Sequence, residues 1–359
     1  MFRSVLIFSF YFLAVPFGEA QGGRVDSCLT SEADAYMDRQ QAALLGEVFA
    51  VARQYPPAWP APRIRQTALY LFDAVMHDPA VAYRRPVQKI FHERIAAAVR
   101  DMEKTRVQEG ARVWKLYNMG YVVRTASVTV AFDVVRGYSV GSAGFTLPDS
   151  LMRRLAAQCD ILFVSHKHRD HQDPVVARLF LAAGKPVVAP RQVWLGTSLY
   201  DSVTHLPRVA DSLQHLTLPG GRTLGVIVYP GHQMARTDVN VVLILTPEGI
   251  HIAHLGDQIN EGDFMDDFAW IDHVAEHYSV DIMMVTVWAS HLPRIARGFR
   301  PRLTLLGHED ELGHPVDDRD PWWGDTTYSE PSLRAFYNSG FPYLRMMWGE
   351  TFHYLPHEK

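Results

Sequence analysis

The stretch SHKHRDHQDP, residues 165–174, carries four side chains of metal-binding type within six positions. It follows ILFV, residues 161–164, an apolar run that predicts a buried strand. It ends in Asp173-Pro174, which is typical of a helix cap followed by proline at the first helical position. The stretch is therefore predicted to lie on a loop between a strand and a helix.

The order of side chains in this loop predicts two metal-binding pairs. In extended backbone His166 and His168 point the same way and can reach one metal, whereas Asp170 and His171 can reach a second as the chain turns into the helix. Neutral imidazole and carboxylate are ligands that zinc, manganese and iron accept. Ordinary structural histidines are the alternative, but they would not be expected to cluster in this way.

Three further candidate ligands follow later apolar runs. His232 stands in YPGHQ, Asp257 in HLGDQ and His308 in LLGHED. With the pattern His-x-His-x-Asp-His, these positions resemble the metallo-β-lactamase superfamily over roughly residues 113–310. The resemblance implies two divalent cations, Zn²⁺ first, with Mn²⁺ or Fe²⁺ as alternatives. It assigns His166, His168 and His232 to one cation and Asp170, His171 and His308 to the other, with Asp257 bridging them.

A dinuclear centre of this kind predicts hydrolysis. Paired cations lower the pKa of a bridging water and polarise a carbonyl or phosphoryl oxygen. Asp170 is also a catalytic candidate, because a carboxylate beside that water can orient it and relay its proton. His291, at the end of a strand, is a candidate for substrate binding or leaving-group protonation, with a surface role as the alternative. Asp133 and His254 are candidates to hydrogen-bond metal-bound histidines, with simple packing or exposure as the alternative.

Several segments are most similar to one branch of the superfamily, that of ascorbate-phosphate lactonases and of the phospholipase D that acts on N-acyl phosphatidylethanolamine. These segments are YPGHQ, the strand pair VNVVLILTPEGIHIAHLGD and the hairpin WKLYNMGYVVRT. Asp257 departs from secreted β-lactamases in their usual forms. We therefore expect an α/β fold of the αββα type and an exported hydrolase of an ester, lactone or phosphodiester. The alternatives are a β-lactamase and a metal-containing binding or scaffold protein, although scaffold descendants tend to lose ligands and this chain has lost none.

The region before the resemblance is helical in pattern. Apolar residues recur every three or four positions from Thr30 to about Gly110, interrupted by QYPPAWPAPR at 54–63. From residue 113 the period changes to two, and later strands are expected at 161–165, 185–190, 223–230, 239–246, 250–255, 281–289 and 302–307. We expect a helical N-terminal domain, 24–112, which caps the active site or forms an acyl-binding groove. The metallo-β-lactamase-like domain follows at 113–359.

The N-terminus is typical of a secretory signal. Residues 1–20 contain one Arg, an apolar run interrupted by Pro16, and small residues before a cleavage point after Ala20. An N-terminal membrane anchor is the alternative. Cleavage would leave an exported chain, periplasmic or secreted, without an integral span, in which Cys28 and Cys159 either pair or leave Cys159 as a buried thiol.

The charge composition limits which classes of partner the protein is expected to bind. Of 359 residues, 35 are Lys or Arg and 39 are Asp or Glu, giving a net charge of −4 with no basic block. This balance does not favour nucleic acid, so we expect a small-molecule or lipid-like substrate. The sequence leaves the oligomeric state open. Thirteen of the 17 His fall between positions 166 and 314, and only two in the first 112 residues.

Overall fold

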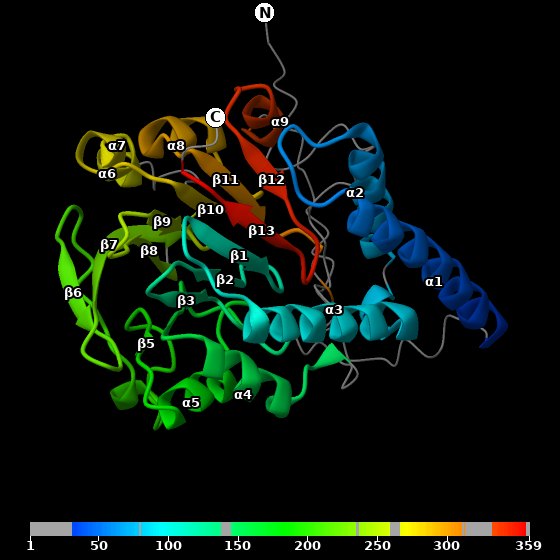
Figure 1. The fold of residues 1–359 in the computed structure, drawn as a ribbon, viewed down its shortest axis with the longest axis horizontal. Coiled ribbons are helices and arrows are strands. Elements are labelled where there is room, and N and C mark those ends of the chain that lie inside the picture. Colours follow the sequence, from blue (N-terminus) through cyan, green and yellow to red (C-terminus); the bar gives the residue numbers. More distant parts are fainter. Residues whose placement is uncertain are drawn as a thin grey trace, which may run out of the picture.

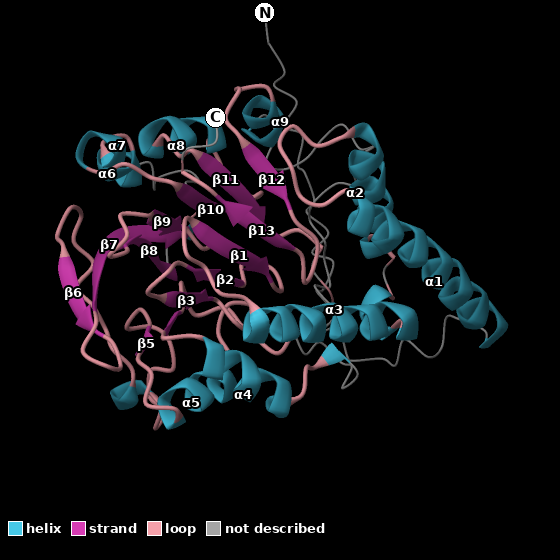
Figure 2. Cartoon of the chain, in the orientation of Figure 1, coloured by secondary structure: helices cyan, strands magenta, loops and turns pink. Residues whose placement is uncertain are grey.

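Two mixed β-sheets lie face to face between two layers of helices in the computed structural model (Figures 1 and 2). The structure describes residues 31–78, 80–137, 145–234, 237–258, 266–310, 312 and 332–356. The predicted αββα sandwich is confirmed, because mixed sheets expose two apolar faces and each face is covered by another layer.

The first sheet has the strand order β13-β1-β2-β3-β4-β5. Its antiparallel part includes the predicted hairpin, in which β1 pairs with β2, while β3, β4 and β5 run parallel. The bounds are β1 Ala111–Lys115, β2 Tyr121–Arg124, β3 Thr129–Phe132, β4 Ile161–Phe163, β5 Val187–Val188 and β13 Thr351–Tyr354.

The second sheet has the order β12-β11-β10-β9-β8-β7-β6. Strands β6 to β9 are antiparallel neighbours, and β9 to β12 are parallel. The bounds are β6 Gln214–Thr217, β7 Thr223–Gln233, β8 Thr237–Leu245, β9 His251–His254, β10 Ile282–Thr286, β11 Leu303–Gly307 and β12 Tyr343–Arg345.

The helices divide between the two outer faces. Those next to the first sheet are α1 Ser31–Gln54, α2 Arg63–Met76, α3 Arg85–Lys104, α4 Asp149–Gln158 and α5 Pro174–Ala182. Those next to the second sheet are α6 Phe268–Ile271, α7 Val274–His277, α8 Leu292–Phe299 and α9 Ser332–Tyr337. Two short 3-10 turns lie at Val81–Tyr83 and Tyr200–Ser202.

Three hydrophobic clusters separate these layers. One lies between the sheets and includes Phe132, Val228 and Met284. A second lies between the second sheet and its helices. The third is continuous from α1, α2 and α3 to the outer face of the first sheet, where Phe72 and Phe91 pack in one cluster with Trp348. The N-terminal helices therefore share a core with the first sheet, and the predicted division after residue 112 stays a prediction.

Several expectations at the chain ends fall outside the described residues. These are the signal segment 1–20, its cleavage after Ala20, and Cys28. Cys159 is buried and is a free thiol. Within the described residues, no helix is both long and apolar enough to cross a membrane.

Candidate metal centre

The first four candidate ligands lie on a loop between a strand, β4, and a helix, α5, as the sequence predicts. Strand β4 ends at Phe163, and α5 begins at Pro174. The carboxylate of Asp173 caps the helix by accepting from the backbone N–H groups of Val175 and Val176. The backbone N–H of His171 donates to the carbonyl of His168, which folds the loop back on itself.

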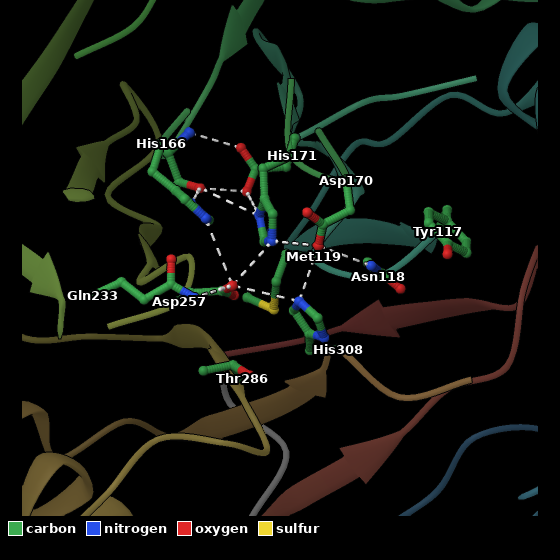
Figure 3. Close-up of polar contacts among 12 residues, drawn as sticks. Tyr117, Asn118, Met119, His166, Asp170, His171, Gln233, Asp257, Thr286 and His308 are labelled. Atoms are coloured by element: carbon green, nitrogen blue, oxygen red, sulfur yellow. Dashed lines mark hydrogen bonds and ion pairs between the residues drawn. The ribbon is translucent and has the colours of Figure 1, made fainter. Parts of the chain in front are cut away.

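Two groups of side chains converge at this loop (Figure 3). The first contains His166, His168 and Asp257, and the second contains Asp170, His171, Asp257 and His308; within each group one ligand atom per residue lies within 4.8 Å of the others. Only His168 is exposed, and the other members are buried. Both groups therefore have the donor set that divalent transition metals accept.

Asp257 lies at the junction of the two groups. Its Oδ2 is 3.6 Å from His166 Nε2, 3.2 Å from His171 Nε2 and 3.4 Å from His308 Nε2. Asp170 Oδ2 lies 2.9 Å from His171 Nε2 and 3.0 Å from His308 Nε2. The geometry places one carboxylate where it can serve two cations.

Two buried atoms test whether a metal fits here. His166 Nε2 and Asp257 Oδ1 have no hydrogen-bond partner within the described part of the chain. An unsatisfied buried polar atom costs free energy, so such atoms call for a partner. A cation between these donors would satisfy both atoms, and the residues present fit a metal centre.

Ser165 and Asp133 orient two of the imidazoles. Asp133 Oδ2 lies 2.8 Å from His171 Nδ1 and accepts from Ser165 Oγ at 2.6 Å, while Ser165 Oγ lies 3.0 Å from His166 Nδ1. Since the hydroxyl proton goes to Asp133, the Ser165 oxygen accepts from His166 Nδ1–H. Both rings then turn Nε2 toward the metal site.

Gly256 allows the strand ends to approach this closely. Its φ is +53°, and a Cβ at this position would lie 2.5 Å from the Cβ of Ser165. A side chain here would push apart the loop of Asp257 and the loop of His166. In the Gly-Asp pair, Gly256 is thus required for steric reasons, and Asp257 supplies the candidate ligand.

Two carboxamides hold the carboxylates. Asn118 Nδ2 donates to Asp170 Oδ2 at 3.1 Å, and Gln233 Nε2 donates to Asp257 Oδ2 at 3.1 Å. Asn118 lies in the β1–β2 turn with a φ of +46°. Neither residue was a sequence candidate, and a turn asparagine in LYNMG was the only signal for Asn118.

His232 lies in neither close group. At the end of β7, its Nδ1 lies 2.9 Å from Asp267 Oδ1, and its backbone N–H donates to Gln258 Oε1. Gln258 in turn donates to Asp267 Oδ2. A carboxylate on the second ring nitrogen is typical of a metal-binding histidine. The assignment of His232 to the first metal stays a prediction.

Burial and neighbouring charges set the protonation of the centre. Burial, and then the charge of His171, lowers the pKa of His166 to about 3, so its ring is neutral. Burial opposes ionisation of Asp170 and Asp257, but the imidazoles of His171 and His308 hold both carboxyl pKa values well below the ordinary range. Against its own burial, these carboxylates raise the pKa of His171. The negative charges of Asp170 and Asp257 therefore favour either a proton on His171 or a bound metal cation in its place.

The two remaining candidates, His254 and His291, contact residues outside the two ligand groups. His254 Nε2 lies 3.8 Å from Asp133 Oδ2 and 2.9 Å from the carbonyl oxygen of Met119, with its ring stacked on Phe132. His291 is exposed at the start of α8, with a φ of +58° and its ring 5.7 Å from that of Phe268. His291 belongs to neither ligand group, and its catalytic role stays a prediction.

Comparisons with known proteins agree with this architecture. A family model described as the β-lactamase superfamily domain matches residues 112–296. No curated protein sequence matches the chain.

Several solved structures are similar in fold. The diiron β-hydroxylase CmlA from Streptomyces venezuelae is 17% identical, with 69% of this chain and 55% of CmlA covered and a TM-score of 0.44. This chain therefore spans about half the length of CmlA. An isothiocyanate hydrolase from Delia radicum gut bacteria is 14% identical, with 68% and 99% covered and a TM-score of 0.45. A metallo hydrolase from Ignicoccus hospitalis is 12% identical, with 68% and 99% covered and a TM-score of 0.43.

Proposed function

Since the chain belongs to the metallo-β-lactamase superfamily and is a metal-dependent hydrolase of that superfamily, we propose that it is an exported, dinuclear enzyme that cleaves an ester, lactone or phosphodiester. The observation that carries the proposal is the position of Asp257 between two histidine-rich groups. A single-metal site would need only one of those groups, whereas this arrangement offers ligands to two ions that share a carboxylate.

The chemistry follows from what each side chain can do. Two divalent cations, when bound, supply a hydroxide near neutral pH and polarise the oxygen of the scissile group. His166 and His168 would hold one cation and Asp170, His171 and His308 the other; Asp257 would bridge them.

Asp170 has the additional task of handling a proton. Its Oδ2 accepts from Asn118 Nδ2, which fixes the orientation of the carboxylate. A carboxylate that is held in this way could accept a proton from a water molecule at the centre. With the metals bound, Asp170 would orient the nucleophilic water and relay its proton toward the leaving group.

Two exposed apolar residues that are close in the chain to residues of the centre favour a substrate with an apolar part. Leu195 is 68% exposed and Met234 is 59% exposed. Met234 follows Gln233, which contacts Asp257, and Leu195 follows Trp194, whose indole N–H donates to Gln172. Large exposed apolar side chains are typical of a binding surface for apolar groups. They support a lipid-like ester or phosphodiester, in keeping with the lactonase and phospholipase D branch that the sequence resembles.

Metal content and turnover test the proposal together. We expect purified protein to contain about two equivalents of divalent metal, with Zn²⁺ as the leading candidate. It should hydrolyse members of a panel of nitrophenyl esters, acyl lactones and bis-nitrophenyl phosphate. His168→Ala should lose metal and activity, whereas His273→Ala, on the exposed surface, should change neither.

The alternatives have separate readouts. Turnover of nitrocefin by the zinc-loaded protein, with no turnover of the ester and lactone panel, would favour a β-lactamase instead. Metal content below one equivalent, together with an inactive panel, would contradict the enzyme and favour a binding or scaffold protein. Export is tested by the N-terminal sequence of protein recovered outside the cytoplasm, which should begin after Ala20.

A further inference from the structure

A cavity of about 240 Å³ lies at the junction of α1, α3, β1 and β13, elements that can be followed in Figure 1. None of the residues that line it is a candidate metal ligand. Its walls come from the end of α1, from α3 and from the segment entering β13, so it joins the N-terminal helices to the first sheet. The cavity plays no part in the hydrolysis proposed above.

Two arginines face this cavity without a carboxylate partner. Arg53 and Arg94 both line it, and neither forms an ion pair with any acidic residue in the described ranges. The two acidic residues in the lining are already engaged. Asp101 accepts from Trp114 Nε1 at 2.8 Å and lies 3.9 Å from Arg112 Nη2. Both oxygens of Glu350 accept from Arg65, and neither Arg65 nor Arg112 belongs to the lining. The cavity therefore has a surplus of positive charge.

Arg94 is held in place before any ligand arrives. Its Nε donates to the carbonyl of Trp348 at 3.0 Å, and its guanidinium carbon lies 4.9 Å above the ring of Phe49. Burial lowers the pKa of Arg94, the charge of Glu350 raises it, and the charge of Arg53 lowers it; a bound anion would offset the charge of Arg53. A fixed guanidinium loses little conformational freedom when it binds a carboxylate.

The rest of the lining adds one polar group and an apolar surface. Thr351 Oγ1 is buried and has no hydrogen-bond partner within the described segments. Trp114 and the side chains of alanines and prolines form the remaining walls. The lining thus combines two guanidinium groups with an apolar surface.

We propose that this cavity binds a small organic acid. Its carboxylate would accept from Arg94 and Arg53, with Thr351 as a further donor, and its hydrocarbon part would lie against the alanine and proline side chains of the lining. A volume of about 240 Å³ leaves room for a small organic acid such as hexanoate. The occupant would connect α1 and α3 to β13 and stabilise their contact.

Isothermal titration of the metal-loaded full chain with hexanoate tests this site. We expect saturable binding that weakens at least tenfold in Arg94→Gln, because a charge-assisted contact is lost. Arg53→Gln, at an exposed position, should weaken binding in the same direction and provides the test if Arg94→Gln fails to fold. Arg100→Gln, an exposed arginine on the same helix, is the matched control and should bind normally. Hexanol should not bind, because it has no charge.

Other outcomes would overturn the proposal. Absence of hexanoate binding would do so, as would equal affinities of Arg94→Gln and Arg100→Gln. Binding that is lost in His168→Ala but kept in Arg94→Gln would place the acid at the metal centre. Binding of hexyl phosphate or inorganic phosphate at the arginines without binding of hexanoate would contradict the carboxylate.

Discussion

At the scale of single residues, Ser165 controls the orientation of two candidate ligands. Its hydroxyl donates to Asp133 and lies 3.0 Å from His166 Nδ1. Ser165→Ala removes the acceptor for His166, and the resulting freedom of the ring should lower metal affinity by about 10-fold to 100-fold. Competition with a chromogenic chelator measures this change. Ser198→Ala, at an exposed position, should have no effect, and an unchanged affinity in Ser165→Ala would contradict the assigned role.

Lys115 predicts a pH-dependent loss of stability. Its Nζ is buried without a hydrogen-bond partner in the described structure and lies 4.3 Å from the ring centroid of Tyr121. Burial lowers its pKa to about 7, despite the attraction of Asp310 and Glu309. The unfolded chain keeps a pKa near 10.5. Stability therefore falls as pH decreases from about 10.5 to about 7, and the full penalty applies below that range.

Lys115→Met tests this penalty. It should raise the free energy of unfolding at pH 6.5 by roughly 2–4 kcal/mol, because the charge no longer has to be buried. The gain over the wild type should shrink as pH rises toward 10. Urea unfolding at both pH values measures it, with the exposed Lys89→Met as control. A variant that is less stable than the wild type at pH 6.5 would contradict the prediction.

The sequence predicted the candidate metal ligands better than the residues that hydrogen-bond to those ligands. Residues 166, 168, 170 and 171 are close in the chain, so their spacing alone places them together. Asn118 and Gln233 contact carboxylates 52 and 24 positions away, and such contacts depend on strand pairing that residue spacing does not contain. Asp133 was a candidate because it ends a strand, and it does contact His171.

At the scale of elements, a buried ion pair connects α2 to the segment before β13. Arg65 donates to both carboxylate oxygens of Glu350 at 2.9 and 2.7 Å, with side chains 1% and 3% exposed. Arg65→Met leaves Glu350 as an unpaired buried charge and should lower the free energy of unfolding by about 3–5 kcal/mol. Urea unfolding at neutral pH measures the loss.

A second variant separates the charge from the packing. Arg65→Met combined with Glu350→Gln removes both charges and should recover part of the lost stability, since no uncompensated carboxylate remains. Arg154→Met, which breaks an exposed pair with Glu103, should change stability little. If the double variant is as unstable as the single one, the ionic explanation is wrong.

The sequence predicted the strands that have long apolar runs, and it did not predict the short strand β12. Strands β7 to β11 lie within a few residues of their predicted bounds, because their apolar runs are long and bounded by turns. The helical pattern that was predicted to reach about Gly110 ends at Lys104, since the polar stretch that follows has no apolar face to bury. Strand β12 has only three residues and depends on its neighbour β11, so its sequence carries little signal.

At the scale of the whole molecule, the periodicity that marks the region from Thr30 to about Gly110 as helical says nothing about what those helices cover. In the structure, Phe72, Phe91 and Trp348 belong to one cluster with the outer face of the first sheet. The N-terminal helices, which lie in the histidine-poor part of the sequence, therefore form a layer that packs in the same core as the first sheet. A shared core predicts a shared unfolding transition.

Unfolding of the metal-loaded protein in urea tests this coupling. We expect the helical signal of far-ultraviolet circular dichroism and the fluorescence of tryptophans to change in one coincident transition, because exposing α1 to α3 also exposes the face of the first sheet. A protease cut in residues 105–110, between α3 and β1, should leave the two fragments associated under native conditions. Separate transitions, or fragments that separate on gel filtration without denaturant, would show that the helices fold as an independent domain.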